Sequence, residues 1–170
     1  MAKKKSGSKV GLIALLVLVV MLVLAIVGIC IDWINTTVTV LGNSTTEGTK
    51  LSELFDTFDG LDTELAGSFK AMASFAILTV ILAGATTVLA GICKVLGWKL
   101  FRFILVIVAI VCVVCGVVSI ITSFTFCDKL GGGSIGDLFS GENAPAAGAW
   151  LTAIGGVLAG LSGVFAAVKN

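Results

Sequence analysis

The side chains that could carry out chemistry in this chain are few, and their types exclude most catalytic mechanisms. The sequence contains no histidine and no tyrosine, so the commonest general base and metal ligand is missing. A nucleophile activated by histidine is therefore excluded. All ten carboxylates lie outside the long apolar runs, so a proton relay or an ion-coupled transporter would have no acid inside the membrane. We expect neither enzyme activity nor a cofactor.

Five cysteines are the remaining reactive groups, and their spacing does not predict a metal site. Cys112 and Cys115 have C-x-x-C spacing but stand inside an apolar run with no second pair nearby, so we expect them to pack as small apolar residues. Cys30 and Cys127 fall at corresponding ends of their runs. If their helices are neighbours, a disulfide between them is feasible outside the reducing cytoplasm; two free thiols are the alternative.

Four long uncharged runs determine the class of protein. The 170-residue chain is 58% hydrophobic and 12% charged, about half the charge of a typical soluble domain. Each run exceeds 20 residues, which at about 1.5 Å per residue spans the roughly 30 Å of hydrocarbon in a bilayer. The sequence therefore predicts an all-α membrane protein, a single bundle of four transmembrane helices. The expected spans are about 10–31, 71–93, 103–127 and 146–168.

Charged residues are sorted between the two ends of these spans. The N-terminal tail, the hinge at 94–102 and the C-terminus hold eight basic residues and no acid. The loops at 32–70 and 128–145 hold all ten acids and only three lysines. By the positive-inside rule, we expect the termini and the hinge in the cytoplasm and both loops outside, in a multi-pass protein of the plasma membrane. The first run lacks a small-residue cleavage site, so we expect an uncleaved anchor.

Small residues indicate the faces through which these helices pack. In a bilayer, close approach of small side chains favours helix association more than apolar burial does. The last span carries two four-residue ladders of glycine and alanine, and the second span has a similar series. We expect this face to pack within the chain, with a homotypic or partner-binding face as the alternative. The predicted face consists of Gly155, Gly156, Ala159, Gly160 and Gly163 in the last span and Ala83, Thr87 and Gly91 in the second.

The long outer loop contains two patterns of secondary structure. Residues 36–40 are all β-branched, which favours a short strand or hairpin. Further on, apolar residues recur at helical spacing over about 50–59, which predicts a short amphipathic helix that covers the mouth of the bundle or docks a partner. The acidic stretch 56–64 matches a calcium-binding loop poorly, because Thr57 and Phe58 break the ligand pattern. The apolar stripe of this helix consists of Leu51, Leu54, Phe55 and Phe58.

Three tryptophans lie near span ends, where the indole ring suits the membrane interface, so we expect Trp33, Trp98 and Trp150 to act as anchors. Cytoplasmic ends, a long first outer loop, a short hinge and a shorter second loop together resemble the claudin and peripheral-myelin-protein type of four-helix membrane protein. Trp33 is similar to the tryptophan that opens their first loop. The family's Gly-Leu-Trp followed by two cysteines is absent, so the resemblance does not imply a paracellular barrier.

These observations favour a membrane protein without catalytic chemistry. We expect an accessory, scaffold or adhesion-like subunit that acts through helix packing and acidic outer loops. The alternative is an oligomeric channel or transporter subunit for a small or apolar solute, in which the glycine face of the last span lines or seals a path. Expected partners are the lipid bilayer and further copies or other membrane proteins, not nucleic acid.

Overall fold

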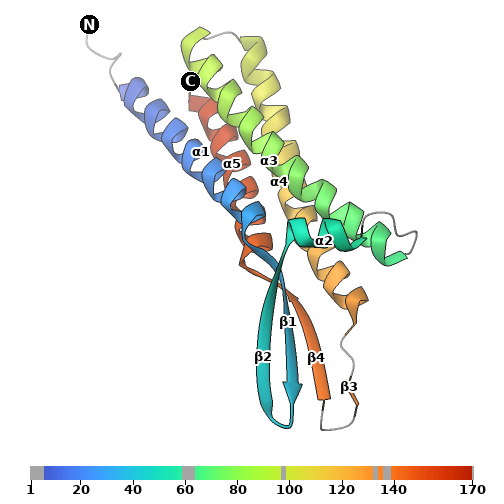
Figure 1. Ribbon diagram of the computed structural model, residues 1–170. Helices are drawn as coiled ribbons and strands as arrows, with labels where there is room; N and C mark the ends of the chain where they lie inside the picture. Colours follow the sequence, from blue (N-terminus) through green and yellow to red (C-terminus); the bar gives the residue numbers. More distant parts are fainter. Residues whose placement is uncertain (1–5, 59–63, 97–98, 132–133, 136–138, 170) are drawn as a thin grey trace, which may run out of the picture.

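A bundle of four long helices forms the body of the protein. The computed structural model describes residues 6–58, 64–96, 99–131, 134–135 and 139–169. Four helices in this part of the chain are long and apolar enough to cross a membrane, which confirms the four predicted spans and a multi-pass membrane protein. They are α1 (Ser6–Cys30), α3 (Glu64–Leu96), α4 (Lys99–Leu130) and α5 (Ala147–Lys169) (Figure 1).

The helices α3 and α4 are longer than the apolar runs that predicted them. α3 has 33 residues, which corresponds to about 50 Å and exceeds the hydrocarbon thickness by roughly 20 Å. Most of the added residues of α3 lie at the end of the bundle that carries the strands, which we call the outer end, whereas α4 gains about one turn at each end. At the outer end α3 continues through polar residues because its buried side still holds a large apolar group, Phe69, whose ring packs on Phe126 of α4.

α5 is the central helix of the bundle. It packs against α1, α3 and α4, while α3 also packs against α4 and α1. α1 and α4 are not neighbours, because α3 and α5 lie between them. A larger share of α5 is buried than of any other described span, and α1 is the most exposed. The small residues of α5 allow this central position, since they let three helices approach its backbone closely.

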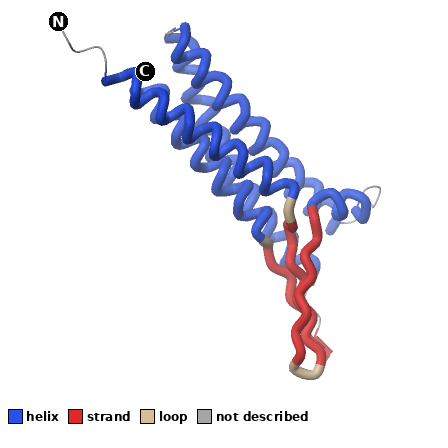
Figure 2. The backbone as a smooth tube through the Cα atoms, turned by 60° about the vertical axis from the view of Figure 1, so that its left-hand side comes forward, coloured by secondary structure: helices blue, strands red, loops and turns tan. Residues whose placement is uncertain are grey.

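A four-stranded antiparallel sheet stands on the outer end; a strand or hairpin was expected in the first outer loop, but the strands of the second outer loop that extend it were not. Its strands are β1 (Asp32–Val40), β2 (Asn43–Lys50), β3 (Ser134–Ile135) and β4 (Phe139–Pro145), in the order β2-β1-β4-β3. The sheet joins the two outer loops, because β1 of the first loop pairs with β4 of the second. Figure 2 shows the strands projecting beyond the ends of the helices.

The predicted hairpin and amphipathic helix both occur in the first outer loop. β1 and β2 connect through Leu41 and Gly42, whose φ angles of 52° and 81° suit the tight primed turns of hairpins. The helix α2 (Leu51–Phe58) follows β2 directly, close to the predicted range of 50–59. Its start is capped by Glu53, whose side chain accepts a hydrogen bond from the Lys50 backbone N–H at 3.2 Å.

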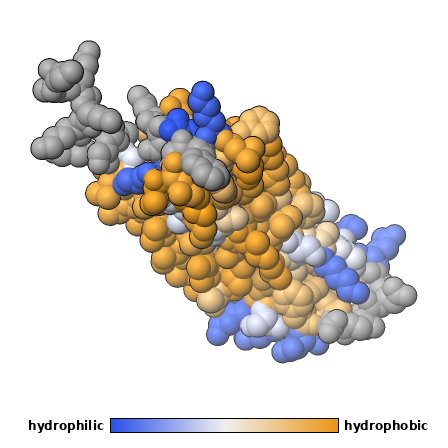
Figure 3. Space-filling view, turned by 90° about the horizontal axis from the view of Figure 1, so that it is seen from above, coloured by the Kyte–Doolittle hydropathy of each residue, from blue (hydrophilic) through white to orange (hydrophobic). Residues whose placement is uncertain are grey.

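Two buried clusters hold the bundle together, one at each end. The outer cluster joins the first residues of β1 to α2 and to the ends of α3, α4 and α5. The inner cluster lies between the four long helices and consists mostly of Ala, Leu and Cys side chains. Figure 3 shows apolar residues over the helices, with polar residues gathered toward the two ends. This distribution is that of a protein whose outside faces lipid along the spans.

Candidate functional site

The predicted glycine face of α5 is buried inside the chain and contacts three different helices. A methyl group added at Gly155 would lie 2.9 Å from the backbone oxygen of Met21 in α1. One added at Gly160 would lie 2.5 Å from the backbone oxygen of Ala109 in α4. Gly156 and Gly163 approach α3, and Ala159 is fully buried. These residues therefore support intrachain packing, and they offer no free surface to a partner.

The small residues predicted in α3 divide between two environments. Ala83 is fully buried in the inner cluster. Thr87 is half-buried and donates a hydrogen bond to the carbonyl of Ala83 at 2.8 Å, while a methyl group added at Gly91 would meet nothing within 4 Å. Thr87 and Gly91 thus lie outside the packing face, contrary to expectation. The residues of α3 that do meet the glycines of α5 are Thr79 and Thr86.

A further close helix crossing lies at the outer end, between Gly28 of α1 and the start of α5. A methyl group at Gly28 would lie 2.7 Å from the backbone nitrogen of Thr152, and one at Gly148 would lie 2.6 Å from the Gly28 oxygen. The Thr152 hydroxyl reaches back to the Ala25 carbonyl at 3.4 Å. Neither Gly28 nor Gly148 belongs to the packing face that the sequence predicted. A glycine in an apolar run can indicate a close helix crossing, but each of these glycines stands at a helix end, where glycine is common for other reasons.

Trp33 lies beside this crossing and is not the interfacial anchor that its position predicted. Its side chain is fully buried, and its indole N–H donates a 2.7 Å hydrogen bond to the Gly28 carbonyl. Trp150 is 45% exposed and packs edge-to-face on Phe124, an environment compatible with the predicted anchor role. The predicted anchor Trp98 lies outside the described residues. Because the buried Trp33 ring of β1 is hydrogen-bonded to α1, it fixes the sheet to the helices.

The apolar stripe of α2 covers the mouth of the bundle, as one of its two interpretations predicts. Leu51, Leu54 and Phe58 are buried, and Phe55 is 37% exposed. The Phe58 ring lies 5.4 Å from the ring of Phe69 in α3 and 5.5 Å from that of Phe126 in α4, as measured between centroids. Such aromatic pairs stabilise beyond their burial alone. α2 is thereby attached to both extended helices. The acidic segment 59–63 lies outside the described residues.

The cysteines of the described chain are all free thiols, so the Cys30–Cys127 disulfide does not form. Its condition fails, because α1 and α4 are separated by α3 and α5. Cys30 is exposed and Cys127 is buried in the outer cluster. Cys112 is fully buried and its thiol donates to the Gly156 carbonyl at 3.3 Å, which agrees with a packing role. Within the described ranges, no three metal-ligating side chains come together.

The outer sheet presents an exposed, polar edge strand. β2 is an edge strand, and every residue in it except Thr49 is exposed. Side chains tie it to β1 through hydroxyl pairs, Thr37 with Thr46 and Thr39 with Ser44, each at 2.9 Å. On the other side of β1, Thr36 donates to Asn143 of β4 at 2.8 Å. The free edge of β2 therefore stands on a supported sheet.

No protein-family model matches the chain, and no curated protein matches it at a significant level.

Proposed function

We propose that this chain is a non-enzymatic membrane protein that associates with other membrane proteins through its outer sheet, as a scaffold or adhesion-like subunit. The observation that carries the proposal is the free edge of β2. An edge strand offers a row of backbone N–H and C=O groups to an incoming strand. Soluble proteins protect such edges with prolines, bulges or several charges, whereas β2 has no proline and carries only two charges of opposite sign, Glu47 and Lys50.

The bundle supports this role by holding the sheet in a constant position. Trp33 and the phenylalanines around α2 connect the strands to the helices, and the pairing of β1 with β4 connects the two loops. A docking edge on such a support loses little conformational entropy on binding. The proposed resemblance to claudin-like proteins adds the same order of helices and outer loops, without the barrier role.

The alternative, an oligomeric channel or transporter subunit, has less support. In a channel or transporter of this kind, the glycine face of α5 would line or seal a solute path between copies of the chain. That face instead packs on α1, α3 and α4 of the same chain. The described spans contain no acid in their apolar runs, so the electrostatic features of ion pathways are also absent from this part of the chain.

We further propose that the sheet lies outside the cell and that both termini lie in the cytoplasm of a plasma-membrane protein. The eight-to-three division of basic residues supports this orientation. Cys30 at the outer end then faces the exterior, and Cys93 and the hinge face the interior.

Labelling of intact cells with a membrane-impermeant maleimide should modify Cys30, to the same extent with and without reductant. The reason is that Cys30 is an exposed free thiol, while Cys127 is only 3% exposed. The variant Cys30→Ser should abolish the signal, and the modified residue can be located by mass spectrometry of peptides. Labelling that requires reductant would indicate a disulfide, and labelling only after lysis would reverse the orientation.

A photo-crosslinking amino acid placed at Thr45 should form adducts of defined mass with neighbouring proteins, whereas the same group at Val38 should not. The two positions are a matched pair, because they face each other across β1 and β2 at the same level and both are exposed. Only Thr45 is on the free edge, so a partner strand passes next to it. Electrophoresis of the whole membrane fraction measures the adducts.

Equal adducts at the two positions would indicate random collision and contradict edge docking. An absence of adducts at both would show that the sheet edge has no partner in that membrane. Mass analysis of the Thr45 adduct distinguishes a second copy of this chain from another membrane protein.

A further inference from the structure

The outer hairpin carries an unexpected residue at its tip. Leu41 has a φ angle of 52°, a left-handed backbone that is unfavourable for leucine, and its side chain is 72% exposed. Figure 1 shows the turn between β1 and β2 as the part of the hairpin farthest from the helices. Glycine or asparagine would fit this turn without strain and without exposing an apolar side chain. A contact outside the chain therefore explains leucine here better than the fold does.

The free edge of β2 offers the backbone groups of three residues. In an antiparallel pair, hydrogen-bonded residue pairs alternate with pairs whose side chains lie closer together. The hydroxyl contacts of Thr37 with Thr46 and of Thr39 with Ser44 mark the second kind, and the two-residue turn at the tip requires the same alternation. The backbone groups of Ser44, Thr46 and Gly48 therefore point away from β1, toward a strand that would join the edge.

We propose that the partner of this edge is β2 of a second copy of the chain, paired antiparallel about a two-fold axis at Thr46. This inference rests on the proposed function, because it names the partner of the same edge. In this register Thr46 pairs with Thr46 of the second copy, and Ser44 pairs with Gly48 in both directions. Each pair exchanges two backbone hydrogen bonds, so about six form and all the outward groups are used. Registers centred on other residues of β2 leave some of these groups without a partner strand.

The side chains of β2 are compatible with this register. The strand carries two charges, Glu47 and Lys50. With the axis at Thr46, Glu47 lies level with Thr45 of the second copy and Lys50 lies level with Gly42, so like charges do not face each other. Thr46 then faces Thr46, which is a favourable cross-strand pair. An axis at Glu47 would instead place two carboxylates opposite each other, which destabilises a sheet.

The direction of β2 places the second copy in a facing membrane. Directly paired residues lie on the same face of a sheet, so a two-fold axis between identical edge strands is perpendicular to the sheet and reverses the strand direction. Figure 2 shows the hairpin running outward from the ends of the helices. A reversed copy therefore has its helices at the far end of the joined strands. The two Lys50 residues would stand about 27 Å apart, which is eight residues at about 3.4 Å each.

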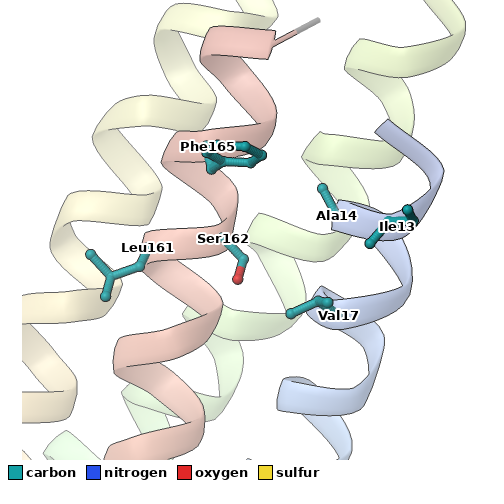
Figure 4. Close-up of a pocket in the computed structure, with 6 residues that line it drawn as sticks. All are labelled: Ile13, Ala14, Val17, Leu161, Ser162 and Phe165. Carbon is teal, nitrogen blue, oxygen red and sulfur yellow. The ribbon is translucent and has the colours of Figure 1, made fainter. Parts of the chain in front are cut away.

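The same register brings the exposed Leu41 to a groove at the outer end of the bundle. Leu41 comes level with Leu51 of the second copy, the first residue of α2. A mostly apolar groove of about 410 Å³ lies there between α1, α2 and α3, and it accepts the leucine side chain. The groove between α1 and α5 that Figure 4 shows lies near the inner end, where an outer hairpin does not reach. The receiving groove is lined by Ile29, Cys30, Leu51, Ser52, Phe55 and Ile77.

The test is adhesion between lipid vesicles that contain only the purified full chain, measured by turbidity. Wild-type vesicles should adhere. Thr46→Lys and Thr46→Glu should each reduce adhesion about tenfold or more, because like charges then meet at the axis. A mixture of Thr46→Lys vesicles with Thr46→Glu vesicles should adhere again, since opposite charges meet between the two membranes. The matched control Ser44→Lys adds the same charge to the same strand but opposite Gly48, and it should reduce adhesion much less.

Two further variants test the contact of Leu41 with the groove. Asparagine suits a left-handed turn, so Leu41→Asn should leave the hairpin at least as stable as in wild type while weakening adhesion about tenfold through loss of the apolar contact. Ser52→Phe fills the groove and should weaken adhesion similarly. Thr57→Phe adds the same ring to an exposed position of α2 outside the groove and should adhere normally. Circular dichroism checks the fold of each variant, and maleimide labelling of Cys30 in dilute samples counts the sheets that face outward.

Three results would overturn the inference. The first is an absence of adhesion between wild-type vesicles whose sheets face outward. The second is a failure of the mixed Thr46→Lys and Thr46→Glu vesicles to adhere. The third is undiminished adhesion of both Leu41→Asn and Ser52→Phe. If wild-type vesicles stay apart while Thr45 still forms specific adducts in native membranes, the partner is another protein and the proposed function stands; if the adducts are absent too, both fail.

Discussion

Gly160→Ala should lower the free energy of unfolding by about 1–3 kcal/mol, whereas Gly91→Ala should raise it by up to about 1 kcal/mol. At Gly160 the new methyl group would lie 2.5 Å from the Ala109 backbone oxygen and 3.1 Å from the Val113 backbone nitrogen. The backbone of α4 must move to accept it, because no side-chain rotation relieves such a contact. At Gly91 nothing lies within 4 Å, so alanine only stiffens the helix.

Unfolding of both variants in detergent, followed by circular dichroism, measures this difference. The comparison is matched, because both changes add one methyl group to a helical glycine of a membrane span. Equal stabilities would contradict the close contact between Gly160 of α5 and the backbone of α4. Association in detergent should be unchanged in both variants, since neither glycine lies on a proposed interface between copies.

Trp33→Ala should lower the free energy of unfolding by about 3–5 kcal/mol, and Trp150→Ala by about 1 kcal/mol. Trp33 is fully buried, and its removal leaves a cavity where β1 meets α1 and α5. It also deprives the Gly28 carbonyl of the 2.7 Å hydrogen bond. Trp150 loses only an edge-to-face contact with Phe124 at 5.9 Å between centroids. A total stability of about 5–15 kcal/mol makes the first loss a large fraction.

Limited proteolysis of the protein in native membranes checks this prediction, because release of the sheet exposes the β1–β2 hairpin to protease. We expect rapid cleavage in Trp33→Ala and slow cleavage in wild type and Trp150→Ala. The variant Trp33→Phe retains an aromatic ring but has no N–H donor, so its cleavage rate should be intermediate. Identical rates in all four proteins would contradict the role of Trp33 as the connection between sheet and bundle.

Local patterns in the sequence determined much of this fold. Apolar runs longer than 20 residues can satisfy their backbone in hydrocarbon only as helices, so the four spans followed directly. The hairpin followed from β-branched residues at 36–40, and α2 from apolar side chains at helical spacing. Both α2 and the hairpin are formed by neighbours in the chain, and a pattern confined to one segment is sufficient to predict such elements.

The tertiary structure alone decided which segments meet. β4 contains glycine, asparagine and proline, which disfavour strands, and it is extended because β1 supplies its hydrogen bonds from about 100 residues away. The position of Trp33 after the first span predicted an interfacial anchor. In the structure its side chain is fully buried beside the close crossing of Gly28 and Gly148. The glycines of α5 predicted close packing, but their partners depended on the arrangement of four helices. The separation of α1 from α4, which keeps Cys30 and Cys127 apart, is a property of that arrangement. The sequence of neither helix alone could predict it.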